Sequence, residues 1–168
     1  MQKIIVIGCP GAGKSTFSRA LQSKIGLPLF HLDMLFWNTD KTNVSREEFD
    51  QKLCDILKQE TWIIDGNYGR TLEMRLKECD TVFLLDFPVS VCLSGVESRL
   101  GKPREDMPWI EQELDEEFKE WITDFPKKEL PHVYELLDNY KDKTVIIFKS
   151  HHEIDRYLEK LYIAESIL

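Results

Sequence analysis

The chain has 168 residues, of which 42% are apolar and 31% are charged, and its formal net charge is −8. This length suggests one domain large enough to bury its own core, and the composition excludes disordered, collagen-like and low-complexity proteins. The acidic balance argues against a nucleic-acid-binding surface, which needs clustered Lys and Arg, so direct binding to nucleic acid is not expected.

Short apolar runs without polar alternation are spaced along the whole chain. Such runs are typical of strands in a parallel sheet that is covered on both faces. The five predicted strands are Ile4–Ile7, Leu29–Leu32, Trp62–Ile64, Val82–Leu85 and Val145–Phe148. Segments with helical spacing of apolar residues lie between them, so the pattern predicts a three-layer α/β domain.

Particular residues mark the ends of the predicted helices. Gly26 follows the first helix and is a C-terminal stop. Two capping boxes, Ser45 with Glu48 and Ser150 with Glu153, begin later helices. The helix boundaries are therefore predicted from side-chain chemistry as well as from apolar spacing.

One segment carries most of the net negative charge, because residues 104–129 hold ten acids and four bases. Apolar residues from Ile110 to Phe125 recur at three- and four-residue steps, which predicts one long helix there. A solvated helix face is the simpler explanation of the charge, and a face for a partner protein is the alternative.

Four cysteines, at positions 9, 54, 79 and 92, lack the spacing of a zinc site, so reduced thiols are expected. The apolar run near Met1 is too short for a signal peptide, and no run approaches the length of a membrane span. We therefore expect a cytoplasmic protein with no membrane partner.

The strongest chemical signal is Gly8-Cys-Pro-Gly-Ala-Gly13-Lys14-Ser15, which matches the phosphate-loop (Walker A) pattern G-x-x-x-x-G-K-[ST]. It follows a predicted strand and begins a predicted helix, which is the context that the pattern requires. Backbone N–H groups of such a loop surround phosphate oxygens, while Lys14 contacts the β and γ phosphates and Ser15 can ligate Mg²⁺. The residues expected to hold the nucleotide are Gly8, Pro10, Gly11, Ala12, Gly13, Lys14, Ser15 and Thr16.

Two carboxylates compete for the magnesium side of this loop. Asp65 ends the third predicted strand, and Asp86 ends the fourth. A carboxylate in this place can hold a Mg²⁺-bound water beside the phosphates. We favour Asp65, and a turn residue at a strand end is the other interpretation of each.

Two classes of nucleotide-binding protein fit the sequence poorly. The guanine-reading motif Asn-Lys-x-Asp and a D-x-x-G switch are absent, which argues against a GTPase. The chain is also short for an AAA-type motor module with its accessory helical domain.

Taken together, these motifs resemble the adenylate-kinase-like P-loop kinases. Asp65-Gly-Asn-Tyr-Gly-Arg70 is similar to the family's Asp-Gly-Phe-Pro-Arg, whose Arg grips the acceptor phosphate, and His31-Leu-Asp33-Met-Leu35 is similar to Gly-Asp-Met-Leu-Arg. The combination of His-Leu-Asp, Trp-Ile-Ile-Asp-Gly-Asn-Tyr and Glu-Phe-Lys-Glu-Trp is most similar to the bacterial DNA topology modulation protein group, over the whole chain. The resemblance implies a five-stranded parallel sheet of order 2-3-1-4-5.

Residues 98–104, Ser-Arg-Leu-Gly-Lys-Pro-Arg, resemble the segment that enters the family's lid. The resemblance implies a short helical lid over about residues 99–130, inserted in a single P-loop kinase domain over residues 1–168. Arg99 and Arg104 would then neutralise the nucleotide and the moving phosphate. Surface arginines paired with the acids that follow them are the alternative.

The chain departs from the monophosphate kinases on the acceptor side. Phe36 and Trp37 stand where an Arg follows the family's Asp-Met-Leu, and Asn67 and Tyr68 replace its Phe-Pro. Asp33 can accept the proton of an attacking hydroxyl, as small-molecule kinases require. A cap or turn residue at Asp33, and core packing of Phe36 and Trp37, are the other interpretations.

These observations predict an ATP- and Mg²⁺-dependent phosphotransferase that acts on a small acceptor. The expected catalytic residues are Lys14, Asp33, Arg70, Arg99 and Arg104, with Arg99 also on the nucleotide. The expected acceptor residues are Asp33, Phe36, Trp37, Asn67, Tyr68 and Arg70, and the metal residues are Ser15 and Asp65. The alternatives are a nucleoside monophosphate kinase with altered acceptor-phosphate contacts and a nucleotide-binding regulatory protein with little turnover.

Overall fold

The computed structural model describes the chain from Met1 to Glu165, with side chains to Leu161. Its elements are β1 (Lys3–Gly8), α1 (Lys14–Ile25), β2 (Leu29–His31), α2 (Leu32–Phe36), α3 (Arg46–Leu57), β3 (Trp62–Asp65), α4 (Gly69–Glu78), β4 (Thr81–Leu85), α5 (Val89–Glu97), α6 (Glu116–Lys128), α7 (Leu130–Asn139), β5 (Thr144–Phe148) and α8 (His151–Glu165). None of the described helices is both long and apolar enough to cross a membrane.

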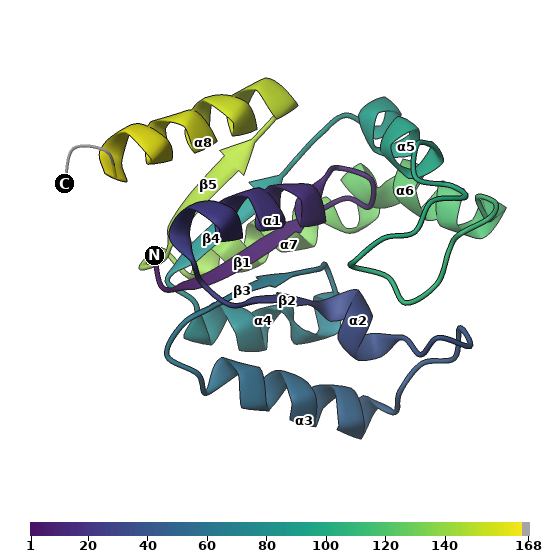
Figure 1. The fold of residues 1–168 in the computed structure, drawn as a ribbon, viewed down its shortest axis with the longest axis horizontal. Coiled ribbons are helices and arrows are strands. Elements are labelled where there is room, and N and C mark those ends of the chain that lie inside the picture. The colour runs from purple at the N-terminus through teal and green to yellow at the C-terminus, as the bar shows by residue number, and fades with distance from the viewer. Residues whose placement is uncertain (166–168) are drawn as a thin grey trace.

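The five strands form one parallel sheet in the order β2-β3-β1-β4-β5, with helices on both faces (Figure 1). Alternate side chains of β1 enter two separate cores. Ile4 and Val6 pack in the core with α1 and α8, whereas Ile5 and Ile7 pack in the core with α3, α4 and α7. This arrangement confirms the predicted fold class and strand order. Apolar strands without polar alternation are covered by helices on both faces, as is usual for a parallel sheet.

The predicted helix ends follow the expected chemistry. Gly26 takes the left-handed conformation, with φ of 70°, after α1. The Ser45 hydroxyl accepts a hydrogen bond from the Glu48 N–H at 3.1 Å, and the Ser150 hydroxyl accepts one from the Glu153 N–H at 3.3 Å. These contacts confirm the serine half of each capping box, while the Glu153 carboxylate accepts from the Lys149 N–H at 2.7 Å.

The predicted long helix from Ile110 is wrong in its first part. Residues 98–115 form a loop between α5 and α6, which we call the α5–α6 loop, and α6 begins only after Asp115, whose carboxylate accepts from the Glu117 N–H at 3.2 Å. Glu111 is instead held by the start of the loop: its carbonyl oxygen accepts a hydrogen bond from the Gly101 N–H at 2.7 Å, and its carboxylate pairs with Arg99 and Arg104. The apolar spacing therefore continues through a segment whose backbone is hydrogen-bonded outside a helix.

The loop after β1 packs directly against α5. A Cβ added at Gly11 would lie 1.9 Å from the carbonyl oxygen of Cys92, and a Cβ added at Gly95 would lie 2.1 Å from the carbonyl oxygen of Gly11. Real Cβ atoms do not approach oxygen so closely, so both positions require glycine. The backbone of the loop and the backbone of α5 are in van der Waals contact.

This contact predicts the effect of one methyl group. Gly95→Ala should lower the free energy of unfolding by about 1–3 kcal/mol, because the new Cβ overpacks two backbone segments. Gly69→Ala is the matched control: nothing lies within 4 Å of its added Cβ, so its stability should stay the same or rise by up to about 1 kcal/mol. Urea unfolding of both variants measures the difference, and equal stabilities would contradict the close contact.

Candidate functional site

A cavity of about 790 Å³ opens at the carboxyl ends of the central strands. Its wall includes the loop between β1 and α1, helix α2, the loop between β3 and α4, and the α5–α6 loop, together with residues of α1, α4, α5, α6 and α7. In Figure 1 the α5–α6 loop reaches from α5 toward α2. Ligands of open parallel sheets bind at this edge, beside the strand where the connections change direction, and β1 is that strand here.

The phosphate loop folds as its glycines require. Gly11 and Gly13 have φ of 81° and 91°, which is left-handed backbone that glycine adopts without strain. The Gly8 N–H donates to the Oδ1 atom of Asn67 at 2.9 Å, which ties the phosphate loop to the loop after β3. Because α1 begins at Lys14, the positive end of its dipole lies at the cavity.

Lys14 is held inside the phosphate loop. Its Nζ donates to the carbonyl oxygens of Gly8 at 2.9 Å and Cys9 at 3.1 Å. Burial lowers the pKa of Lys14, and the negative charges of Asp65 and Asp33 oppose this shift. The ammonium therefore lies among acceptors, at the place where the motif predicts the β and γ phosphates.

Asp65 is only 3% exposed and ends β3 beside β1. The Nδ1 atom of His31 donates to its Oδ1 at 2.8 Å, and the β2–β3 register places these two residues side by side. Burial by itself would lower the pKa of His31, but the hydrogen bond and the charge of Asp65 outweigh it and raise that pKa. The other oxygen of Asp65, Oδ2, is buried and has no hydrogen-bond partner.

Asp86, the competing carboxylate, is engaged elsewhere. It accepts a hydrogen bond from the Tyr134 hydroxyl at 2.6 Å and pairs with the ammonium of Lys149. Asp65 lines the cavity and Asp86 does not. The geometry therefore supports Asp65 as the carboxylate beside Lys14.

The donors beside Lys14 fit Mg²⁺. Asp65 offers a buried oxygen without a partner, and Ser15 lines the same cavity. Mg²⁺ prefers oxygen ligands and is usually bound by one or two carboxylates together with substrate phosphates and water. Within Met1–Glu165 no three His, Cys, Asp or Glu side chains gather as a metal cage, so the phosphates would have to supply the remaining ligands.

Asp33 lies on α2, on the other side of the cavity from α5. Its Oδ1 accepts a hydrogen bond from the Tyr68 hydroxyl at 2.7 Å. Burial raises the pKa of the Asp33 carboxyl, while the Tyr68 hydrogen bond and the charge of Lys14 limit the rise. Asp33 and Tyr68, both expected on the acceptor side, are thus brought together.

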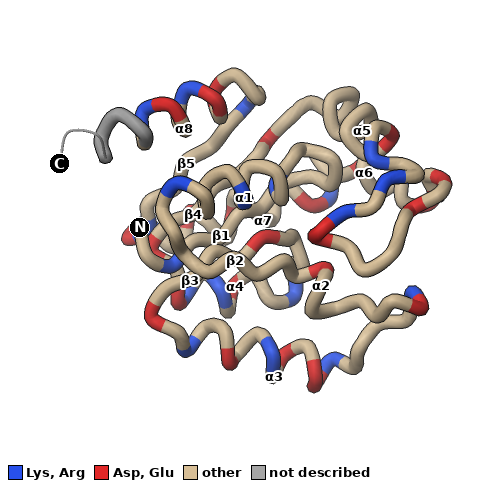
Figure 2. The backbone as a smooth tube through the Cα atoms, in the orientation of Figure 1, with Lys and Arg blue, Asp and Glu red and all other residues tan. Residues whose placement is uncertain are grey.

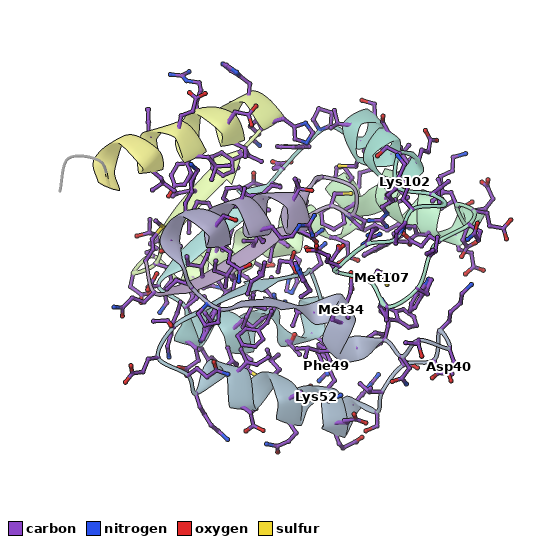
Figure 3. The ribbon with its side chains drawn as sticks, in the orientation of Figure 1. Met34, Asp40, Phe49, Lys52, Lys102 and Met107 are labelled. Carbon is purple, nitrogen blue, oxygen red and sulfur yellow. The ribbon has the colours of Figure 1, made fainter. Side chains whose placement is uncertain are left out.

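Aromatic rings surround this pair. Phe36 lies edge-to-face on Trp37 at 4.9 Å and on Tyr68 at 5.2 Å, and it also meets Phe49 of α3. Figure 3 labels Phe49, which points from α3 toward α2. Trp109 of the α5–α6 loop completes the wall at 5.0 Å from Trp37. Trp109 was not expected in the site, although a tryptophan within a polar loop is a signal for it.

The α5–α6 loop carries both expected arginines into the cavity wall, each paired with an acid. Arg99 lies 3.0 Å from a Glu111 carboxylate oxygen, and Arg104 donates to Glu111 at 2.7 Å. Figure 2 shows acidic and basic residues next to one another along this loop, and Figure 3 shows Met107 of the loop near α2. Both arginines are therefore paired with acids, as the alternative expected, but they lie in the cavity wall and not on the open surface.

Asp106 is a buried residue of this loop that the motifs did not assign to the site. It accepts from two nitrogens of Arg104, at 3.1 and 2.8 Å, and lies 3.9 Å from Arg19 of α1. Burial would raise the pKa of Asp106, but hydrogen bonds from Arg104 and from the Ser15 hydroxyl lower it. A carboxylate of the α5–α6 loop thus lies beside the phosphate loop.

Arg70 does not join the other expected residues. Its guanidinium makes a two-point pair with Asp50 of α3, at 2.9 and 2.5 Å, and it does not line the cavity. The helix that starts at Gly69 turns this side chain outward. Arg75, one and a half turns further along α4, is the inward-facing arginine.

Arg75 is fully buried and supports the loop after β3. It donates to the carbonyl oxygens of Gly66, Asn67 and Tyr68. Burial lowers the pKa of Arg75 to about 10, so it stays charged at neutral pH. In the sequence Arg75 precedes Leu76 on the apolar face of α4, and the motif comparison missed this signal.

Solved structures share this fold. Shikimate kinase from Bacteroides thetaiotaomicron has a TM-score of 0.60, 17% identity and a match over 97% of each chain. Shikimate kinase from Acinetobacter baumannii, solved in complex with shikimate, has a TM-score of 0.63 and 17% identity, over 99% of this chain and 94% of that one. At such identity the likeness shows the fold alone.

Curated relatives include the adenylate kinases of Thermotoga neapolitana and Thermotoga maritima. Each is 28% identical over 88 residues, which is 51% of this chain and 39% of the relative. The match therefore covers well under half the length of these kinases. The relatives and the structural neighbours named here are all kinases.

A family model described as AAA domain matches residues 4–119. That range holds the phosphate loop, Asp33, Asp65 and the α5–α6 loop. The chain is short for a motor module with an accessory helical domain, and a match to the AAA domain alone does not imply such a module. Because the match covers most of the sequence, the chain belongs to the AAA domain family and is a P-loop, kinase-like protein.

Proposed function

We propose that this protein is an ATP- and Mg²⁺-dependent phosphotransferase that moves the γ-phosphate to a hydroxyl group of a small acceptor. One observation carries the proposal. Lys14, the unpartnered Oδ2 atom of Asp65 and the partly buried carboxylate of Asp33 all belong to one cavity. A phosphate site and a candidate base therefore stand next to each other.

The phosphate loop and Lys14 bind the nucleotide phosphates. Ser15 and Asp65 would hold Mg²⁺, which neutralises charge on the phosphates when it is bound. His31 fixes one oxygen of Asp65 and leaves the other directed away from that hydrogen bond. Asn67 keeps the loop after β3 against Gly8.

Asp33 is the proposed general base. A raised pKa makes a carboxylate a better proton acceptor, and a position beside the phosphate site lets it meet the attacking hydroxyl. The Tyr68 hydroxyl orients it through the 2.7 Å hydrogen bond. Phe36 and Trp37 form the wall against which the acceptor packs.

Arg99 and Arg104 are proposed to stabilise the charge that develops on the moving phosphate. Both lie on the cavity wall, in a loop that joins two helices, and the Glu111 carboxylate holds them close together. Arg70 has no part in this proposal, because its guanidinium is paired with Asp50 outside the cavity.

The curated relatives named adenylate kinase favour a second candidate, a nucleoside monophosphate kinase. Such an enzyme needs cations on the phosphate of the acceptor, and the outward position of Arg70 removes the one that the motif offered. A nucleotide-binding regulatory protein with little turnover is the remaining alternative. The comparisons support the likeness to P-loop kinases and not the finer resemblance to the DNA topology modulation group.

Lys14→Ala should slow phosphotransfer by roughly 10²–10³-fold, the usual effect of removing one preorganised charged donor. The measurement is ADP release with MgATP and a panel of hydroxylated acceptors. Lys52→Ala, on the exposed surface of α3, is the matched control and should keep its activity (Figure 3). Full activity in Lys14→Ala would remove this lysine from the mechanism.

Asp65→Asn should shift the Mg²⁺ dependence of nucleotide binding to higher concentration, because an amide oxygen is a weaker ligand for a hard cation than a carboxylate. Asp86→Asn should leave this dependence in place and should instead lower stability by breaking the contact with Lys149. Calorimetric titration of ATP at several Mg²⁺ concentrations separates the two. The opposite pattern would assign the metal to Asp86.

A further inference from the structure

The acceptor half of the cavity lies between α2 and the tip of the α5–α6 loop. It is lined by Asp33, Phe36, Trp37, Tyr68 and Trp109. No cation is found among these residues, and Asp33 itself has only a neutral hydroxyl as its hydrogen-bond partner. Lys14 and Arg104 act on the Asp33 carboxylate through their charge, but neither forms an ion pair with it, so Asp33 faces the acceptor with only the Tyr68 hydroxyl in contact.

The cations of the neighbouring walls already face acids or backbone oxygens. Arg104 contacts Asp106 at 2.8 Å and Glu111 at 2.7 Å, and Arg99 shares Glu111. Lys14 is committed to the phosphate loop. An acceptor that carried a phosphate or a carboxylate would therefore compete with these acids for Arg99 and Arg104.

The whole cavity wall has more acids than bases. Its described lining holds four cationic side chains, Lys14, Arg19, Arg99 and Arg104, and seven acidic ones, Asp33, Asp65, Asp106, Glu111, Glu113, Asp115 and Glu129. ATP adds further negative charge when it binds. The potential in the acceptor half therefore favours a positively charged molecule.

The aromatic wall suits the same kind of ligand. Trp37 meets Trp109 at 89° and Phe36 at 88°, so the rings form right-angled corners that line the cavity. An aromatic face carries partial negative charge and attracts ammonium groups, most strongly at tryptophan. The acidic side chains and the tryptophan rings therefore both favour a positively charged acceptor.

We propose that the acceptor is a small alcohol that also carries an ammonium group. This inference rests on the proposed phosphotransfer. The ammonium group binds at Trp37 and Trp109, and the hydroxyl group meets Asp33. The hydroxyl oxygen forms a bond to the γ-phosphorus as its proton passes to the Asp33 carboxylate. The bond from the γ-phosphorus to the β–γ bridging oxygen breaks, and ADP leaves with that electron pair.

Matched pairs of acceptors test the charge directly. The full chain with MgATP is given choline or its uncharged isostere 3,3-dimethylbutan-1-ol, and amino sugars or the corresponding neutral sugars. AMP and shikimate serve as anionic acceptors, and ADP release is measured. We expect at least one ammonium alcohol to exceed its uncharged partner in kcat/KM by about 5- to 30-fold, the range for a desolvated cation on an aromatic face.

Two variants at one position assign that preference to the aromatic wall. Trp37→Phe keeps an aromatic face and should keep most of the preference, whereas Trp37→Leu should reduce the ratio for the charged and uncharged pair toward one. The ratio is taken within each variant, so a loss of folded protein affects both terms equally. An undiminished ratio in Trp37→Leu would overturn the assignment.

The outcomes separate this inference from the proposed function. If an anionic or uncharged acceptor gives a higher kcat/KM than every ammonium alcohol, phosphotransfer stands and the inference fails. If MgATP binds but no acceptor of any charge stimulates ADP release, both fail. Micromolar binding of AMP that is lost in Arg70→Ala would likewise overturn the inference in favour of the monophosphate kinase.

Discussion

The buried charge of Lys14 is the constraint on which the site depends. An ammonium group taken from water is costly unless acceptors and negative charges surround it. The structure supplies two carbonyl oxygens of the phosphate loop and the field of two aspartates from different parts of the sheet edge. Those aspartates need support of their own, and His31 and Tyr68 provide it. Lys14, the two aspartates and the groups that hold them therefore form one connected set of charges and hydrogen bonds.

Much of the fold follows from local patterns in the sequence. The apolar strands, the glycine after α1 and the two capping boxes each depend on neighbours within a few residues, so a linear sequence reveals them. The phosphate loop is recognisable for the same reason. The helix predicted from Ile110 is wrong because apolar spacing continues through residues 110–115, whereas the Glu111 carbonyl oxygen accepts a hydrogen bond from Gly101, a contact that the spacing does not reveal.

The candidate site was less predictable, because its partners meet only through the tertiary structure. His31 and Asp65 stand 34 residues apart and become neighbours through the β2–β3 register. Arg70 and Arg75 have the same charge on one helix, and only the direction of that helix decides which faces inward. The motif comparison predicted Arg70 in the site, whereas the arginine that is buried beside the site is Arg75. Trp109 and Asp106 reach the site through a loop whose path no periodicity reveals.

The backbone contact between Gly11 and α5 gives the fold a mechanical property. Helix α5 leads directly into the α5–α6 loop, and its other side rests on the phosphate loop without an intervening side chain. Close-packed backbone transmits displacement with little loss. A displacement of α5 would therefore press directly on the phosphate loop at Gly11. Ionic strength, which weakens the ion pairs of the α5–α6 loop, leaves this backbone contact intact.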